Sequence, residues 1–92
     1  MTERTPHGEE RRTEADRPTG EAESDRRKAT EIYRDIESGL YIFVGARGRT
    51  HIYTAKGLHH TSFRTTRGNR RRRVNAGKWE HVERAQLPIE VQ

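Results

Sequence analysis

Histidine and arginine are the residues of this sequence that could do chemistry, and most of the histidines and the longest run of arginines lie in its C-terminal half. Four of the five histidines lie at positions 51, 59, 60 and 81, and four arginines in a row occupy positions 70–73. Histidine takes or gives up a proton near neutral pH and can act as a general acid or base. Arginine binds phosphate through a planar fork of N–H donors. These residue types indicate a phosphate-containing partner that is either bound or cleaved.

The arginine run is the strongest single signal. The segment 67–78 has no acidic residue and holds Arg67, Arg70, Arg71, Arg72, Arg73 and Lys78. On a helix, consecutive side chains step by about 100°, so only two or three of the four adjacent arginines could contact one nucleic-acid backbone together. A solvated loop is the simpler alternative. Four adjacent positive charges repel one another, however, and are rarely left without an anionic partner.

Charge is divided unevenly along the chain. Residues 1–39 hold 8 Lys and Arg against 11 Asp and Glu, whereas residues 40–92 hold 11 Lys and Arg against 3 Glu. Concentrated positive charge attracts polyanions and speeds their association, and the commonest intracellular polyanions are RNA and DNA. A basic surface that serves only solubility would need less asymmetry. The division favours a nucleic-acid partner, and a basic face that docks an acidic protein remains as an alternative.

An enzyme is a further alternative, because metal-independent RNA cleavage needs little more than a proton acceptor, a proton donor and a cation that holds phosphate. His51, His60 and Arg64 could supply these parts if they share one face of a sheet, with Tyr53 or Ser62 in support. Their spacing is not diagnostic, since histidine is also an ordinary nucleic-acid contact. A binding module is therefore favoured over a toxin-like ribonuclease.

Metal ions and small-molecule cofactors are not expected. The adjacent His59 and His60 point to opposite sides of a strand, cysteine is absent, and acidic residues are scarce nearby. Gly45 and Gly48 lack the spacing of a phosphate-binding loop and the helix that follows one. The longest apolar run, residues 40–44, is far shorter than the roughly 20 residues that span a bilayer. A cytoplasmic protein without membrane contact is the resulting expectation.

Three glycine-punctuated strands are expected to position these side chains, at residues 40–45, 49–55 and 58–66. A three-residue loop at residues 46–48, with a left-handed glycine last, pairs Ile42 with Ile52. A two-residue turn at residues 56–57 pairs Tyr53 with His60, and a three-residue turn would exchange His60 for His59.

This register divides the sheet into two faces. The aliphatic face holds Leu40, Ile42, Val44, Ile52 and Phe63. The aromatic and basic face holds Tyr41, Phe43, Arg49, His51, Tyr53, His60, Ser62 and Arg64. Flat rings stack on unpaired bases while Arg and His reach phosphates, so the second face is predicted to be a nucleic-acid platform. The alternative is that the same rings form a second small core under the C-terminal segment, with Trp79 as a candidate partner.

Two helices complete the predicted fold. The first begins after Ser24, ends near Gly39 and packs on the aliphatic face through a stripe formed by Ala29, Ile32, Tyr33, Ile36 and Leu40. The second is short and Arg-rich, with Thr65 or Thr66 as its cap and Gly77 as its end. A last strand covers residues 78–84. The predicted class is α+β: a small antiparallel β-meander of three to four strands, one amphipathic N-terminal helix, and a short Arg-rich helix before the last strand.

The domain organisation and function follow from these elements. Residues 1–24 are predicted to be a disordered charged tail, because they have almost nothing to bury, and residues 25–92 to be one basic domain. We expect a nucleic-acid-binding module, with RNA slightly preferred over DNA. The predicted contacts are Arg49, His51, Tyr53, His60, Arg64, Arg67, Arg70, Arg71, Arg72, Arg73 and Lys78.

Overall fold

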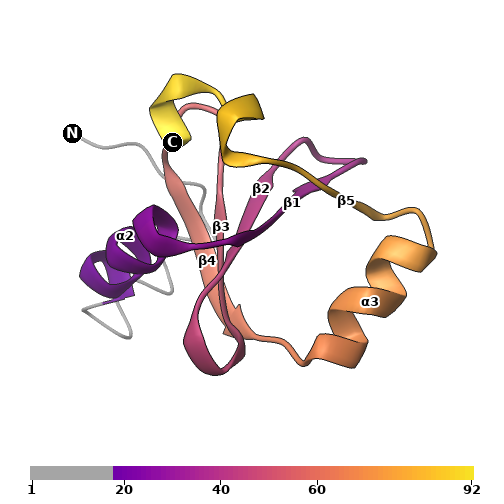
Figure 1. Cartoon of the computed structure of the whole chain (residues 1–92). Helices are drawn as coiled ribbons and strands as arrows, with labels where there is room; N and C mark the ends of the chain where they lie inside the picture. Colours follow the sequence, from indigo (N-terminus) through magenta and orange to yellow (C-terminus); the bar gives the residue numbers. More distant parts are fainter. Residues whose placement is uncertain (1–17) are drawn as a thin grey trace.

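The computed structural model describes residues 18–92. Its elements are helix α2 (Pro18–Lys28), strands β1 (Glu31–Asp35), β2 (Tyr41–Val44), β3 (Arg49–Tyr53) and β4 (His59–Arg64), helix α3 (Arg67–Asn75) and strand β5 (Trp79–His81). Short 3-10 turns lie at Ala46–Gly48, Arg84–Gln86 and Ile89–Val91. The strands form one antiparallel sheet in the order β4-β3-β2-β1-β5 (Figure 1). The α+β class is confirmed, with five strands in the sheet instead of three to four.

The additional strand is β1, and it lies where a helix was predicted. That prediction was wrong. β1 runs between β2 and β5, and it is buried on both faces, with Ile32 in one core and Tyr33 in the other. Such a strand has adjacent apolar residues instead of alternating ones, and here they imitate the spacing of a helix. Gly39 does not end a helix; it takes a φ of 79° in the turn from β1 to β2.

The N-terminal helix exists, but it begins earlier than predicted. Because α2 starts at Pro18, residues 18–24 belong to the folded part and not to the tail. Ala22 and Ala29 are buried against the sheet. The rest of the predicted tail, residues 1–17, lies outside the described residues. Between residues 18 and 92, neither helix is long and apolar enough to cross a membrane.

Two hydrophobic clusters lie on opposite faces of the sheet, and Figure 1 shows α2 on one side and α3 on the other. The cluster under α2 consists of Ala22, Ala29, Ile32, Phe43, Tyr53, Leu87 and Val91. The opposite cluster consists of Tyr33, Ile42, Val44 and Trp79, with Val74 of α3 packed against it. The N-terminal helix therefore covers the aromatic face, and the prediction that it covers the aliphatic face was wrong.

The first hairpin has the predicted register, with Ile42 opposite Ile52. Its loop ends in Gly48, whose φ of 78° is the left-handed conformation expected there. A Cβ on Gly48 would also collide with the carbonyl oxygen of Thr65, so this position requires glycine.

The second hairpin has the predicted register only in part. His51 lies opposite Ser62 as expected, but the register shifts between Ile52 and Tyr53. Tyr53 therefore pairs with His59, and the expected pairing with His60 was wrong. A β-bulge moves one strand relative to its partner in this way. The turn of this hairpin contains three residues, which is the alternative turn length that the sequence left open.

Candidate nucleic-acid interface

The Arg-rich helix α3 has well-defined ends. Thr66 is its N-cap, and the Thr66 hydroxyl accepts a hydrogen bond from the backbone N–H of Asn69 at 3.0 Å. At the other end Gly77 has a φ of 75°, and the N–H of Lys78 donates to the carbonyl oxygen of Arg73 at 2.9 Å. This turn brings Lys78 beside the last turn of the helix. The predicted helix, with Thr66 as its cap and Gly77 as its end, is confirmed.

Arg70 points inward and is neutralised. Its side chain is nearly buried, and Nε donates to the carboxylate of Glu31 at 2.7 Å. A second nitrogen donates to the carbonyl and the hydroxyl of Thr65. Burial would raise the pKa of Glu31, but hydrogen bonds from Tyr33 and Arg70 hold that pKa below its usual range. Arg70 therefore fastens α3 to β1, and its charge is balanced within the fold.

Arg73 is held in a different way. Its guanidinium lies 4.7 Å from the ring centroid of Trp79 and 6.0 Å from that of Phe63. Its Nε donates to Oδ1 of Asn69 at 3.0 Å. The group is half-buried, and no ion pair joins it to a carboxylate within the described part of the chain.

The remaining cations of this segment face solvent: Arg67, Arg71, Arg72 and Lys78 are all exposed. A groove of about 380 Å³ lies at the C-terminal half of α3 and is lined by Asn69, Arg72, Arg73, Ala76 and Lys78. Each lining side chain is cationic or uncharged, so the groove carries positive charge that no lining carboxylate cancels. Phosphate groups are the ligands that such a surface attracts.

The predicted sheet platform, in contrast, lies beneath α2. Tyr53 has 0% exposure, contacts Phe43 edge to face at 5.7 Å between centroids, and donates its hydroxyl hydrogen to Glu23. A ring in this position cannot stack on a base. The alternative, that these rings form a core under the C-terminal segment, is therefore what the fold adopts. Phe43 and Tyr53 share a cluster with Leu87 and Val91 of that segment and with Ala22 of α2, whereas Trp79 belongs to the opposite cluster.

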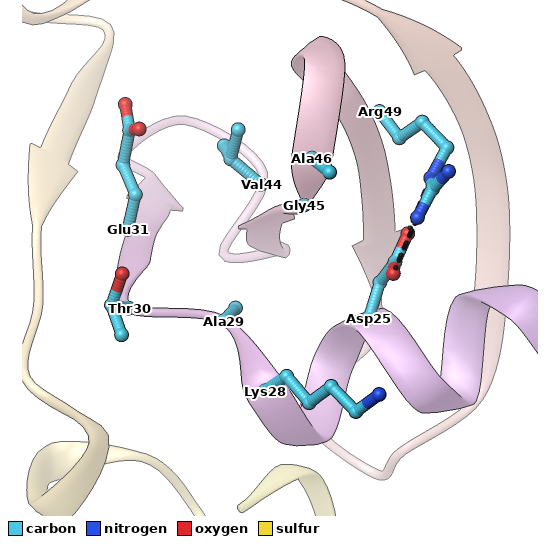
Figure 2. A pocket seen from close by; sticks show the side chains of 9 residues that line it. All are labelled: Asp25, Lys28, Ala29, Thr30, Glu31, Val44, Gly45, Ala46 and Arg49. Carbon is cyan, nitrogen blue, oxygen red and sulfur yellow. Dashed lines mark hydrogen bonds and ion pairs between the residues drawn. The ribbon is translucent and has the colours of Figure 1, made fainter.

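Two further predicted contacts bind a carboxylate of α2. Arg49 donates to both oxygens of Asp25, at 2.9 and 3.1 Å, and His51, only 2% exposed, lies 2.6 Å from the same carboxylate. Burial would raise the pKa of Asp25, but the hydrogen bonds from Arg49 and His51 hold it below its usual range. Figure 2 shows the Asp25–Arg49 pair at one wall of a cleft of about 450 Å³ whose other charged lining includes Glu31 and Lys28. Charges of both signs line that cleft, which makes it a weaker site for a polyanion.

The histidines are arranged differently from the ribonuclease alternative. Oγ of Ser62 lies 2.7 Å from Nδ1 of His51 and 2.8 Å from Nε2 of His59, so Ser62 joins His51 to His59. Both imidazoles are buried. Arg64 is exposed and shares with His51 a small pocket of about 210 Å³, which His60 does not line. His60 lies at the register shift of β4. The trio of His51, His60 and Arg64 is thus not assembled as one site.

Sequence reasoning missed the acidic partners of these cations. Glu23, Asp25 and Glu31 each bind a side chain of the sheet or of α3. The predicted tail, residues 1–24, included Glu23, and no sequence pattern paired Asp25 or Glu31 with a distant cation. The signal available was the charge division itself, since an acidic first half and a basic second half attract each other.

Comparison with known proteins adds no relative. No protein-family model matches the chain, and no curated protein or solved structure matches it at a significant level.

Proposed function

We propose that this chain is a nucleic-acid-binding module whose contact surface is the solvent side of α3 together with Lys78. The observation that carries the proposal is the groove beside α3, where Arg72, Arg73 and Lys78 converge without an acidic lining residue. Arg67 and Arg71 extend the exposed positive charge toward the start of the helix. A phosphate backbone would meet several cations at once along this surface.

The ligand class is RNA or DNA, because backbone phosphate is common to both. RNA keeps the slight preference expected from the sequence. Phosphate contacts position a nucleic acid but read little of its sequence, so we expect weak sequence preference. A cytoplasmic location, where nucleic acids are the abundant polyanions, belongs to the same proposal.

The test removes charge from α3 and, in a matched control, from elsewhere. Arg67, Arg71 and Arg72 are changed together to Gln in one variant; Arg27, Lys28 and Lys56, also exposed, are changed to Gln in the other. Both variants lose the same net charge. Binding to an RNA hairpin and to a DNA duplex is measured by fluorescence anisotropy over a series of salt concentrations.

We expect the α3 variant to weaken binding to both oligonucleotides by tenfold or more and to reduce the slope of log affinity against log salt by roughly 2 to 3. The control variant should change both quantities much less. Equal losses in the two variants would show that binding is not located on α3, and an unmodified chain that does not bind would refute the proposal. Polyglutamate that binds as tightly as RNA would favour an acidic protein partner, and RNA cleaved without metal would favour the ribonuclease.

A further inference from the structure

The guanidinium of Arg73 is fixed before any ligand arrives. Trp79 lies beneath it, Phe63 lies on its border, and Asn69 holds its Nε. Trp79 is itself 2% exposed and belongs to the core, so the surface under the guanidinium is rigid. Arg73 therefore loses its side-chain freedom on folding and not on binding, which favours association.

The helix terminus alone does not explain this arrangement. Arg72 and Arg73 lie in the last turn of α3, where any cation interacts favourably with the helix dipole. A lysine would serve that purpose as well. The dipole does not account for a guanidinium that lies over an indole ring and donates Nε–H to an amide oxygen, because the dipole favours positive charge and not a particular shape or orientation of the group.

The surroundings of Arg73 form a site for an anion. It lines the groove with Arg72, Lys78 and Asn69, and the turn through Gly77 places Lys78 there by its backbone hydrogen bond to Arg73. Arginine has five N–H donors in a planar fork. Since Nε–H is used by Asn69, a phosphate in the groove would accept hydrogen bonds from the terminal nitrogens of Arg73. Arg72 and Lys78 would add charge from the rim.

We infer that this groove is a phosphate subsite in which Arg73 is the preoriented contact for one phosphodiester of a nucleic-acid backbone. The inference rests on the proposed function for its ligand class. It adds a fixed position for one phosphate and different roles for Arg73 and Arg71. Arg73 acts through its shape and orientation, whereas the exposed Arg71 on the same helix acts through its charge alone.

The test changes arginine to lysine in the full chain, at Arg73 and at Arg27, which keeps the net charge. Arg73→Lys loses the planar fork of N–H donors, so its affinity for an RNA hairpin should fall on the order of tenfold. Arg27→Lys makes the same change at an exposed arginine of α2, outside the proposed binding surface, so its affinity should stay within about twofold. Equal behaviour of the two variants overturns the inference. Thermal unfolding of each variant, followed by circular dichroism, confirms that binding is compared between folded proteins.

Trp79 supplies a second readout, because it is the single tryptophan of the sequence. Titration with the hairpin, or with inorganic pyrophosphate as a minimal probe, should change the Trp79 emission of the unmodified chain and not that of Arg73→Lys. If the hairpin fails to bind but pyrophosphate still gives this Arg73-dependent change, the phosphate subsite stands and the nucleic-acid function falls. If the hairpin binds and Trp79 emission does not respond, the inference falls and the function stands.

Discussion

At the scale of single residues, residue type did not reveal which cations face a ligand. Arg49 and Arg70 resemble Arg71 and Arg72 in the sequence, yet each of the first two binds a carboxylate of the fold. The difference depends on contacts between residues far apart in the chain: Asp25 with Arg49, and Glu31 with Arg70. Residue spacing does not encode such contacts, so the sequence predicted a binding surface larger than the one that faces solvent.

The weight of these ion pairs can be tested at Asp25. Changing Asp25 to Ala removes the carboxylate that Arg49 and His51 share, in a site where the Asp25 side chain is 9% exposed. We expect the free energy of unfolding, measured by urea denaturation, to fall by about 2 to 4 kcal/mol. Glu21 is the matched control, because it also lies on α2 and pairs with Arg49, at 3.4 Å, but its side chain is 53% exposed. Glu21→Ala should cost less than about 1 kcal/mol, and equal losses would contradict this account.

At the scale of elements, local signals predicted β2, β3, β4, α3 and β5, because glycine turns and a helix cap lie within a few residues of what they delimit. Local signals did not predict β1 or the early start of α2, because both depend on contacts between residues far apart in the chain. Ile32 and Tyr33 face opposite cores, so the apolar pattern of β1 depends on layers that are distant in sequence. The segment before residue 25 has little apolar surface, and its contacts with the sheet include buried Ala22, the hydrogen bond between Glu23 and Tyr53, and the ion pair that neighbouring Asp25 forms with Arg49.

The earlier start of α2 predicts that Ala22 is a core position. Its side chain is 0% exposed, so Ala22→Glu would bury a charge without a partner and lower the free energy of unfolding by about 3 kcal/mol or more. Ala85→Glu makes the same chemical change at an exposed residue and should stay within about 0.5 kcal/mol. Urea denaturation measures both. An Ala22 variant as stable as the Ala85 variant would show that residues 18–24 are not part of the folded domain.

At the scale of the whole molecule, the acidic and basic halves of the sequence fold against each other. Asp25 and Glu31, from the first half, bind Arg49 of β3 and Arg70 of α3, so part of the basic charge is balanced internally. Four exposed cations, Arg67, Arg71, Arg72 and Lys78, lie on α3 and in the turn that follows it, where the groove has no acidic lining residue. The charge division therefore serves both folding and the proposed binding. The cations that stabilise the fold lie inside it, and those proposed to bind lie on its surface.

This arrangement predicts how stability depends on pH. Glu23, Asp25 and Glu31 all have pKa values below their ordinary values of 4.5, 3.8 and 4.5. In each case burial would raise the pKa, but hydrogen bonds and nearby cations lower it by more than burial raises it. The unfolded chain then binds more protons than the folded one at acidic pH, so stability is complete above these ordinary values and is lost as the pH falls through the lower folded values.

At alkaline pH, stability is lost as the pH rises. Burial and the hydrogen bond to Glu31 raise the pKa of Tyr33 from 10.0 to about 12, so its contribution is complete below pH 10 and is lost as the pH rises through that folded value. Urea midpoints measured across the pH range should therefore form a plateau that falls at both ends. Glu31→Gln should reduce the loss at the acidic end, because one shifted carboxyl is gone, and Tyr33→Phe should reduce the loss at the alkaline end. An acidic limb unchanged by Glu31→Gln would show that the ion pair with Arg70 does not contribute to the stability of the fold.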